Sequence, residues 1–234
     1  MQTRLLLLVL IFLPACTYAA DPLILGKPVD TVAKISSRVL EHAYGQIGIP
    51  IRFAELPAER SLLKANEGSL DGDVNRVAGI EKKYANLVMI PVPINTVEHV
   101  VVTKNHEFTV DGWERLKPYS IAIRIGTKAV ESGTAGLNVT AFPAYEKIFK
   151  LVAQDRYEIS VVGRITAMDY INRYRLKELK VLEPPLTRLP LYHYLHKKHL
   201  NIVEKITRSL QTMLQDGSIA RERELFIENL RNES

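Results

Sequence analysis

The sequence has 234 residues, of which 47% are hydrophobic and 24% are charged, with 12 glycines and 12 prolines. This length and composition are those of a globular protein that can bury a large core, arranged as one domain or two small ones. The net charge of +5 is modest, and basic residues are interspersed with acidic ones without a run of five like charges, which argues against nucleic-acid binding.

The first 20 residues have the order of regions that is typical of a secretory signal peptide. Arg4 precedes an apolar run at residues 5–13, and small residues follow before Asp21. The apolar run is shorter than the ~20 residues that a membrane-spanning helix needs. We therefore expect cleavage after Ala19 or Ala20 and a periplasmic mature protein, with an uncleaved anchor as the alternative.

The sequence contains one cysteine, Cys16, inside this leader. The LPAC segment around it is similar to the box in which bacterial lipoproteins are lipidated, but Pro14 is an unfavourable residue within that box. A lipid anchor at Cys16 therefore ranks second to ordinary cleavage. In either case the mature domain contains no disulfide, so its hydrophobic core has to stabilise it.

The mature sequence alternates between short strand-like runs and amphipathic helical runs. Residues 30–45 predict a helix, because Asp30 is a favourable N-cap, apolar side chains recur at helical spacing and Gly45 follows the last of them. The prolines of NLVMIPVPI are expected to end one strand before another begins. In the first half we expect strands at 22–26, 49–56, 86–94 and 97–104, with helices at 30–45 and 57–68.

The second half repeats this alternation, which predicts an α/β fold with largely parallel sheets in two sets. Tyr145, Ile148, Phe149 and Val152 share one face of a predicted helix. The clearest amphipathic helix is expected to bury Leu200, Val203, Ile206, Leu210, Met213 and Leu214. We expect strands at 119–126, 138–142, 157–163, 180–184 and 189–196, and helices at 127–133, 143–155, 164–176, 199–217 and 218–232.

Two clusters of polar side chains contain residue types that bind metal ions, but they do not have the ligand spacing of a metal site. The two aspartates of LDGD begin like an EF-hand loop, yet Arg76 follows them in place of further oxygen ligands. His193, His196 and His199 converge only on a continuous helix, and the first of them lies in a predicted strand. We expect no metal site, because a turn explains the aspartates and solvated or capping roles explain the histidines.

The segment RIGTKA at 124–129 predicts an anion-binding site. A strand ends there, Gly126 permits close approach of a ligand to the backbone, and Thr127 starts a helix whose first N–H groups are free. The alternative, that Thr127 only caps this helix, fits the pattern equally well. The mature sequence has no cysteine and no G-x-S-x-G or H-E-x-x-H motif, which weakens an enzyme interpretation.

Four segments, at 56–94, 121–133, 152–163 and 194–219, begin with LPAERSLL, IAIRIGTK, VAQDRYEI and YLHKKHLN. In this order they resemble the family 3 extracellular solute-binding proteins, the periplasmic receptors of polar amino-acid ABC transporters. The resemblance implies a type II periplasmic-binding-protein fold, in which two α/β lobes joined by two crossing hinge strands close on a small molecule. It also implies a membrane permease as partner, no cofactor and no enzyme activity.

The resemblance further implies the domain division and part of the site. The signal peptide is expected at 1–20, lobe one at 21–98 plus 190–234, and lobe two at 99–189. Asn75 and Arg76 follow the G-x-L-D turn of lobe one and are expected to face the cleft. The R-x-G-T segment corresponds to the helix start that holds a ligand carboxylate, through Arg124, Gly126 and Thr127.

Two departures from the family pattern change the expected ligand. The family's carboxylate-binding arginine lies in a T-x-E-R context, whereas this sequence reads AGIEKKY there. The aspartate that binds an α-amino group falls at Gly163, which Arg164 follows. An ammonium group therefore lacks its partner, and burying an unpaired charge is costly.

The arginines of the sequence favour a different ligand. Four of them are expected near the cleft, and their guanidinium groups suit an anionic or carboxylate-bearing ligand. Tyr192 is expected to flank the hinge. The four are Arg60, Arg76, Arg124 and Arg164; the alternative is that some lie on the surface or pair with Glu59, Asp73 or Glu158.

Two other functions stay open. A secreted dehydratase-like enzyme on the same scaffold requires a general acid in the cleft, for which Glu59 and Glu158 are the available carboxylates. A sensor module that reports ligand occupancy to a separate signalling protein is the other alternative.

Overall fold

The computed structural model describes residues 21–232. The predicted signal peptide and Cys16 lie outside the described residues. Within residues 21–232, no helix combines the length and the apolar character that crossing a membrane requires.

The centre of the fold is one mixed sheet of eight strands in the order β2-β1-β3-β8-β4-β7-β5-β6. Strands β2, β1 and β3 pair in parallel at one end, and β6, β5 and β7 pair in parallel at the other. The antiparallel pair β4 and β8 joins the two parallel sets. The strands are β1 (Leu23–Pro28), β2 (Ile51–Leu56), β3 (Gly72–Arg76), β4 (Leu87–Thr103), β5 (Ile121–Arg124), β6 (Val139–Phe142), β7 (Ile159–Gly163) and β8 (Lys180–His196).

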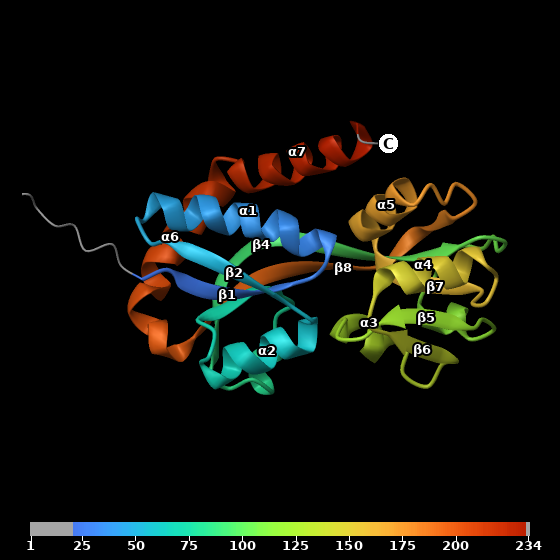
Figure 1. Cartoon of the computed structure of the whole chain (residues 1–234), viewed down its shortest axis with the longest axis horizontal. Coiled ribbons are helices and arrows are strands. Elements are labelled where there is room, and N and C mark those ends of the chain that lie inside the picture. The colour runs from blue at the N-terminus through green and yellow to red at the C-terminus, as the bar shows by residue number, and fades with distance from the viewer. Residues whose placement is uncertain (1–20, 233–234) are drawn as a thin grey trace, which may run out of the picture.

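The helices divide the molecule into two lobes (Figure 1). Lobe one is the part around β1–β3, with α1 and α6 on one side of the sheet and α2 on the other; lobe two is the part around β5–β7 with α3, α4 and α5. Helix α7 packs along α1 and reaches α5. The helices are α1 (Thr31–Gln46), α2 (Ala58–Glu67), α3 (Lys128–Gly133), α4 (Tyr145–Ala153), α5 (Arg164–Arg173), α6 (Leu200–Gln215) and α7 (Ser218–Asn232).

Strands β4 and β8 are each one continuous strand of 17 residues, where the sequence predicts two shorter strands in each case. In lobe one β4 pairs only with β8, because β7 contacts β4 only at residues 99–103. Prolines are tolerated on such an edge, and the register shifts between Met89 and Asn95 absorb Pro91 and Pro93. The two strands therefore run unbroken from one lobe into the other.

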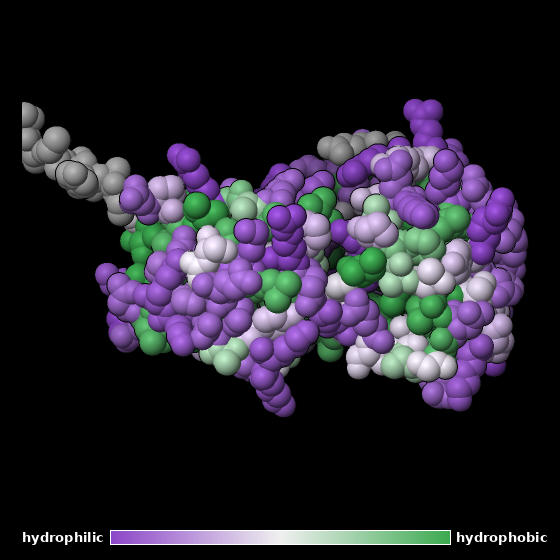
Figure 2. All heavy atoms as spheres, turned by 60° about the horizontal axis from the view of Figure 1, so that its bottom comes forward, coloured by the Kyte–Doolittle hydropathy of each residue, from purple (hydrophilic) through white to green (hydrophobic). Residues whose placement is uncertain are grey.

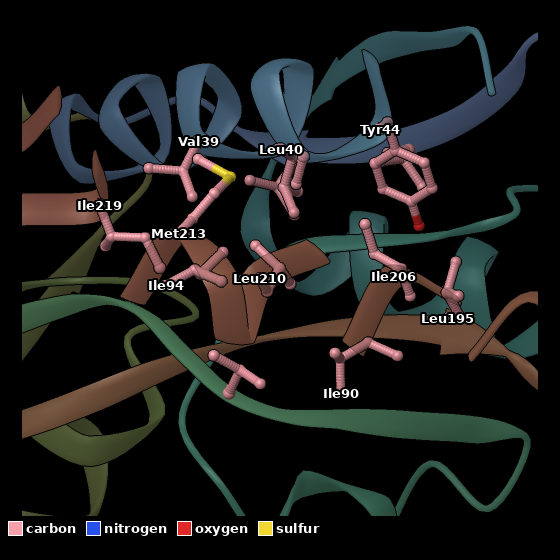
Figure 3. Close-up of a cluster of buried hydrophobic side chains, with 14 residues drawn as sticks. Val39, Leu40, Tyr44, Ile90, Ile94, Leu195, Ile206, Leu210, Met213 and Ile219 are labelled. Carbon is pink, nitrogen blue, oxygen red and sulfur yellow. The ribbon is translucent and has the colours of Figure 1, made fainter. Parts of the chain in front are cut away.

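The core of lobe one lies between α1, α6 and the β4–β8 pair (Figure 3). Ile206, Leu210 and Met213 of α6 are fully buried there, as their helical spacing predicts. Leu200 and Leu214, expected on the same face, are 61% and 47% exposed. Leu200 is the first residue of the helix, and Leu214 is one residue, or about 100°, off the stripe that reaches the sheet.

Local helix signals are confirmed at several places. The Asp30 side chain caps α1 by accepting a hydrogen bond from Ala33 N at 2.7 Å. Gly68 ends α2 in the left-handed conformation, with φ 81°. All four residues expected on the apolar face of α4 are buried.

The expectation of solvated or capping histidines is wrong for His193, which is fully buried in β8. Its Nδ1 donates to Asp73 O at 2.8 Å, and its Nε2 accepts from the Tyr44 hydroxyl at 2.9 Å. His199 bonds to Asp71 Oδ1 at 2.7 Å, so Asp71 acts as the predicted turn residue and His199 helps to fix it. No group of metal-ligating side chains occurs among residues 21–232.

The buried His193 predicts acid lability. Burial lowers its pKa to about 4, so between pH 6.5 and 4 the unfolded chain binds a proton that the folded chain does not. The free energy of unfolding is therefore expected to fall as pH decreases through this window, by about 3 kcal/mol from this histidine. Urea unfolding of wild type and His193→Gln between pH 7 and 4 checks this, because the variant lacks the contribution of this histidine to the change of the free energy of unfolding with pH. The same pH dependence in both proteins contradicts the prediction.

Candidate functional site

A cavity of about 100 Å³ lies where the two lobes meet. In the space-filling view the two lobes are distinct masses that meet at a narrowing of the mostly hydrophilic surface (Figure 2). Lobe one contributes the start of α1, the start of α2 and the end of β3; lobe two contributes the start of α3, β7 and α5, and β4 and β8 form the floor. The lining residues are Asp30, Val32, Ala58, Leu62, Asn75, Arg76, Val77, Ile80, Val97, His99, Gly126, Thr127, Lys128, Ala129, Tyr145, Gly163, Thr166 and Leu191.

Two side chains at the end of β3 that line the cavity each contain an unsatisfied polar atom. Asn75 is 7% exposed, and its Oδ1 is buried without a hydrogen-bond partner. The Nε of Arg76 is also buried and unpartnered. Buried polar atoms of folded proteins are nearly always hydrogen-bonded, so one acceptor and one donor remain unsatisfied in this part of the wall.

The guanidinium of Arg76 is held in a fixed position. Its Nη2 donates to Asp73 Oδ2 at 2.8 Å and to Ala58 O at 2.9 Å. Asp73 is fully buried and also accepts from the Ser61 hydroxyl at 2.6 Å. The Asp73 carboxylate and one backbone carbonyl thus orient Arg76 through Nη2, and its other N–H groups make no hydrogen bond with residues 21–232.

The start of α3 faces this wall from lobe two. Gly126 has φ 87°, and its N–H donates to Glu131 Oε1 at 2.6 Å. A Cβ on Gly126 would lie 3.0 Å from the Cβ of Ala58, so the lobes touch here. Thr127 precedes α3 and makes no side-chain capping bond, so the capping alternative is wrong. The N–H groups of Gly126 and Thr127 are not free, because they donate to Glu131 and to Arg124 O.

Five lining residues with polar side chains were missed by the sequence analysis: Asp30, His99, Lys128, Tyr145 and Thr166. Asp30 caps α1 through one carboxylate oxygen, and burial raises its pKa. His99 is 3% exposed, and burial lowers its pKa to about 4, so the ring is neutral at pH 7. Tyr145 lines the cavity with the Arg124 guanidinium 4.7 Å from its ring centre. Asp30 lies two residues after the end of β1. This position identifies it as a candidate site residue in the sequence, because ligands of open α/β sheets bind at strand ends.

The structure brings five of the nine expected site residues to the cavity: Asn75, Arg76, Gly126, Thr127 and Gly163. Contact of any of them with a ligand stays a prediction.

The other four lie elsewhere. Arg60 is exposed on α2. Arg124 covers Tyr145 and donates to Val29 O at 3.4 Å, across the lobes. Arg164 is bound by Glu98 and Glu183, and not by any of the three carboxylates considered as alternative partners. Tyr192 pairs with Arg76 in the sheet, and its neighbour Leu191 lines the cavity instead.

Comparison with known proteins identifies the fold. No family model matches the chain. An uncharacterized protein of Shewanella oneidensis is 22% identical over 202 residues, which cover 80% of this chain and 74% of that one. A histidine kinase sensor domain with similarity to periplasmic binding proteins superposes with a TM-score of 0.74 at 14% identity, covering 89% of this chain and 96% of the other.

An amino acid ABC transporter substrate-binding protein of Streptococcus pneumoniae, bound to L-arginine, superposes with a TM-score of 0.73 at 8% identity over 89% of this chain and 95% of the other. The chain has the periplasmic-binding-protein fold. This agrees with the resemblance that its sequence motifs indicate. These two neighbours are a sensor domain and a substrate-binding protein.

Polar contacts hold the lobes of this periplasmic-binding-protein fold together across the cavity. Lys128 of α3 pairs with Glu59 of α2 at 2.7 Å. Thr31 of α1 donates to Asp169 of α5 at 2.6 Å. These two contacts join lobe one to lobe two.

Neither carboxylate considered as a general acid is suited to that role. Burial acts to raise the pKa of Glu59, but hydrogen bonds from Lys128 and Tyr84 outweigh it and lower the pKa. Hydrogen bonds from Ser120, through its backbone N–H and its hydroxyl, lower the pKa of Glu158, which does not line the cavity. Both groups are ionised at neutral pH, whereas a general acid has to carry a proton.

Proposed function

We propose that this protein is an exported solute-binding protein that captures a small polar, carboxylate-bearing ligand and delivers it to a membrane transporter. The observation that carries the proposal is the pair of unpartnered atoms in two side chains that line the cavity, Asn75 Oδ1 and Arg76 Nε. Leaving such groups buried and unpaired is unfavourable, so a ligand that satisfies both gains affinity.

The chemistry of the two atoms favours a ligand that both accepts and donates. Arg76 Nε donates, and a guanidinium donor matches a carboxylate oxygen. Asn75 Oδ1 accepts, which suits a hydroxyl or another N–H or O–H group of the same ligand. Because Asp73 and Ala58 already fix the guanidinium, little side-chain entropy is lost on binding.

Export and transport rest on separate support. The leader-like pattern at residues 1–20 supports export. The similarity to an ABC transporter substrate-binding protein supports transport. Similarity to a histidine kinase sensor domain favours a second candidate, a sensor that signals occupancy to a partner. A neighbouring permease gene favours transport, and a neighbouring sensor gene favours signalling.

Ligand binding is expected to close the lobes about the two long strands, at 96–100 and 189–192. In this segment Thr96 pairs with Pro190 and Val97 with Leu189, so both strands bend together. The proposed lobes remain 21–98 plus 190–234 and 99–189.

A thermal-shift screen of residues 21–234 tests the proposal. The screen contains hydroxy, keto and amino carboxylates, dicarboxylates, phosphorylated compounds and cationic solutes. Carboxylates at 100 times Kd are expected to stabilise the protein by about 2.7 kcal/mol. Asn75→Ala is expected to reduce this shift, while Arg60→Ala, exposed and outside the cavity, leaves it unchanged. A response to cationic solutes alone contradicts the proposal.

A further inference from the structure

His99 occupies a distinctive place on the cavity wall. It lies in β4 between β7 and β8, opposite Gly163 on one side and Thr187 on the other. His99 and Gly163 both line the cavity. Gly163 carries no side chain, so the polar group at this point of the wall is the imidazole of His99.

The imidazole has one nitrogen free for a ligand. Its Nδ1 is 2.8 Å from the Thr187 hydroxyl. Its Nε2 makes no hydrogen bond with any residue between 21 and 232. Because burial lowers its pKa to about 4, the ring is neutral at pH 7, and Nε2 presents one hydrogen-bonding group without charge.

The surrounding wall of lobe two also lacks negative charge. Its other polar lining side chains are the hydroxyls of Thr127, Tyr145 and Thr166 and the ammonium of Lys128, which pairs with Glu59. The carboxylate among the lining residues is Asp30, which belongs to lobe one and caps α1 through one of its oxygens. A ligand ammonium placed beside His99 would find no carboxylate in the wall of lobe two, and burying an unpaired charge is costly.

We propose that His99 is a specificity-determining residue of this cleft. Its neutral imidazole hydrogen-bonds through Nε2 to a hydroxyl or carbonyl group of the ligand, next to the ligand carboxylate. The cleft therefore prefers hydroxy- and keto-carboxylates to the α-amino acids with the same carbon skeleton. This inference rests on the proposed function, since it takes the cavity to be the ligand site.

Matched ligand series test the inference by calorimetry at pH 7: malate, oxaloacetate and aspartate; and 2-hydroxyglutarate, 2-oxoglutarate and glutamate. For the series that binds, the hydroxy or keto acid is expected to bind wild type at least tenfold more tightly than the amino acid. His99→Phe is expected to abolish this preference and His99→Gln to retain part of it. The ratio of two affinities within one variant does not depend on the stability of that variant.

Gly163→Asp provides the converse variant. Gly163 has φ −66°, and an added Cβ would make its nearest contact at 3.4 Å with Val97, so the backbone accepts a side chain. Restoring a carboxylate there is expected to shift the preference at least tenfold toward the amino acid.

The outcomes separate the two claims. If carboxylates bind but wild type prefers the amino acid, or if His99→Phe leaves the ratio unchanged, the inference fails and the proposed function stands. If no carboxylate binds, both fail.

Discussion

Replacing Asp73 by alanine is expected to lower the free energy of unfolding by about 3–5 kcal/mol. Asp73 is fully buried and pairs with Arg76, whose side chain is 11% exposed. Without the carboxylate, a guanidinium is left in the interior with Ala58 O as its remaining hydrogen-bond partner, and the Ser61 hydroxyl loses its acceptor. Urea unfolding at pH 7 measures the change.

The double variant Asp73→Ala/Arg76→Met separates charge burial from packing. Because it removes both members of the pair, it is expected to be more stable than Asp73→Ala alone. A loss below 1 kcal/mol for Asp73→Ala, or a double variant less stable than the single one, contradicts the view that this ion pair is a tightly coupled unit.

Replacing Arg76 by alanine is expected to weaken carboxylate binding at least 100-fold, which corresponds to about 2.7 kcal/mol. The variant removes the buried Nε donor from the cavity wall and releases Asp73 from its partner. Arg76→Lys keeps the charge but loses the planar donor arrangement, so it is expected to bind with intermediate affinity. Calorimetry below the unfolding temperature of each variant measures these affinities.

Arg60→Ala is the matched control, because it removes an arginine of the same lobe that is exposed and does not line the cavity. Its affinity is expected to equal that of wild type. Equal affinities of Arg76→Ala and wild type place the ligand away from β3 and contradict the proposed site.

Local signals in the sequence predict local structure well in this protein. The cap at Asp30, the helix end at Gly68 and the buried face of α4 depend on residues close in sequence, and each is found as expected. The alternation of strands and helices likewise predicts the two parallel strand sets. These features require no knowledge of which distant segments pair.

Features that depend on the pairing of strands far apart in the sequence could not be predicted from the sequence. The prolines of β4 are compatible with one long strand because β4 is an edge within lobe one, and that follows from the strand order. Arg164 follows Gly163 in the motif, but Glu98 and Glu183 come from two other strands to bind it. His99 lies in an apolar strand run, and pairing with β7 is what places it beside Gly163.

A crystal structure of residues 21–234 with the carboxylate that gives the largest thermal shift tests the proposed cleft most directly. We expect a ligand carboxylate oxygen at about 2.7–3.2 Å from Arg76 Nε and a ligand donor at similar distance from Asn75 Oδ1. A ligand bound outside this cavity contradicts the account, for example in the cavity of about 570 Å³ between α5 and α7 that Arg173 and Arg175 line.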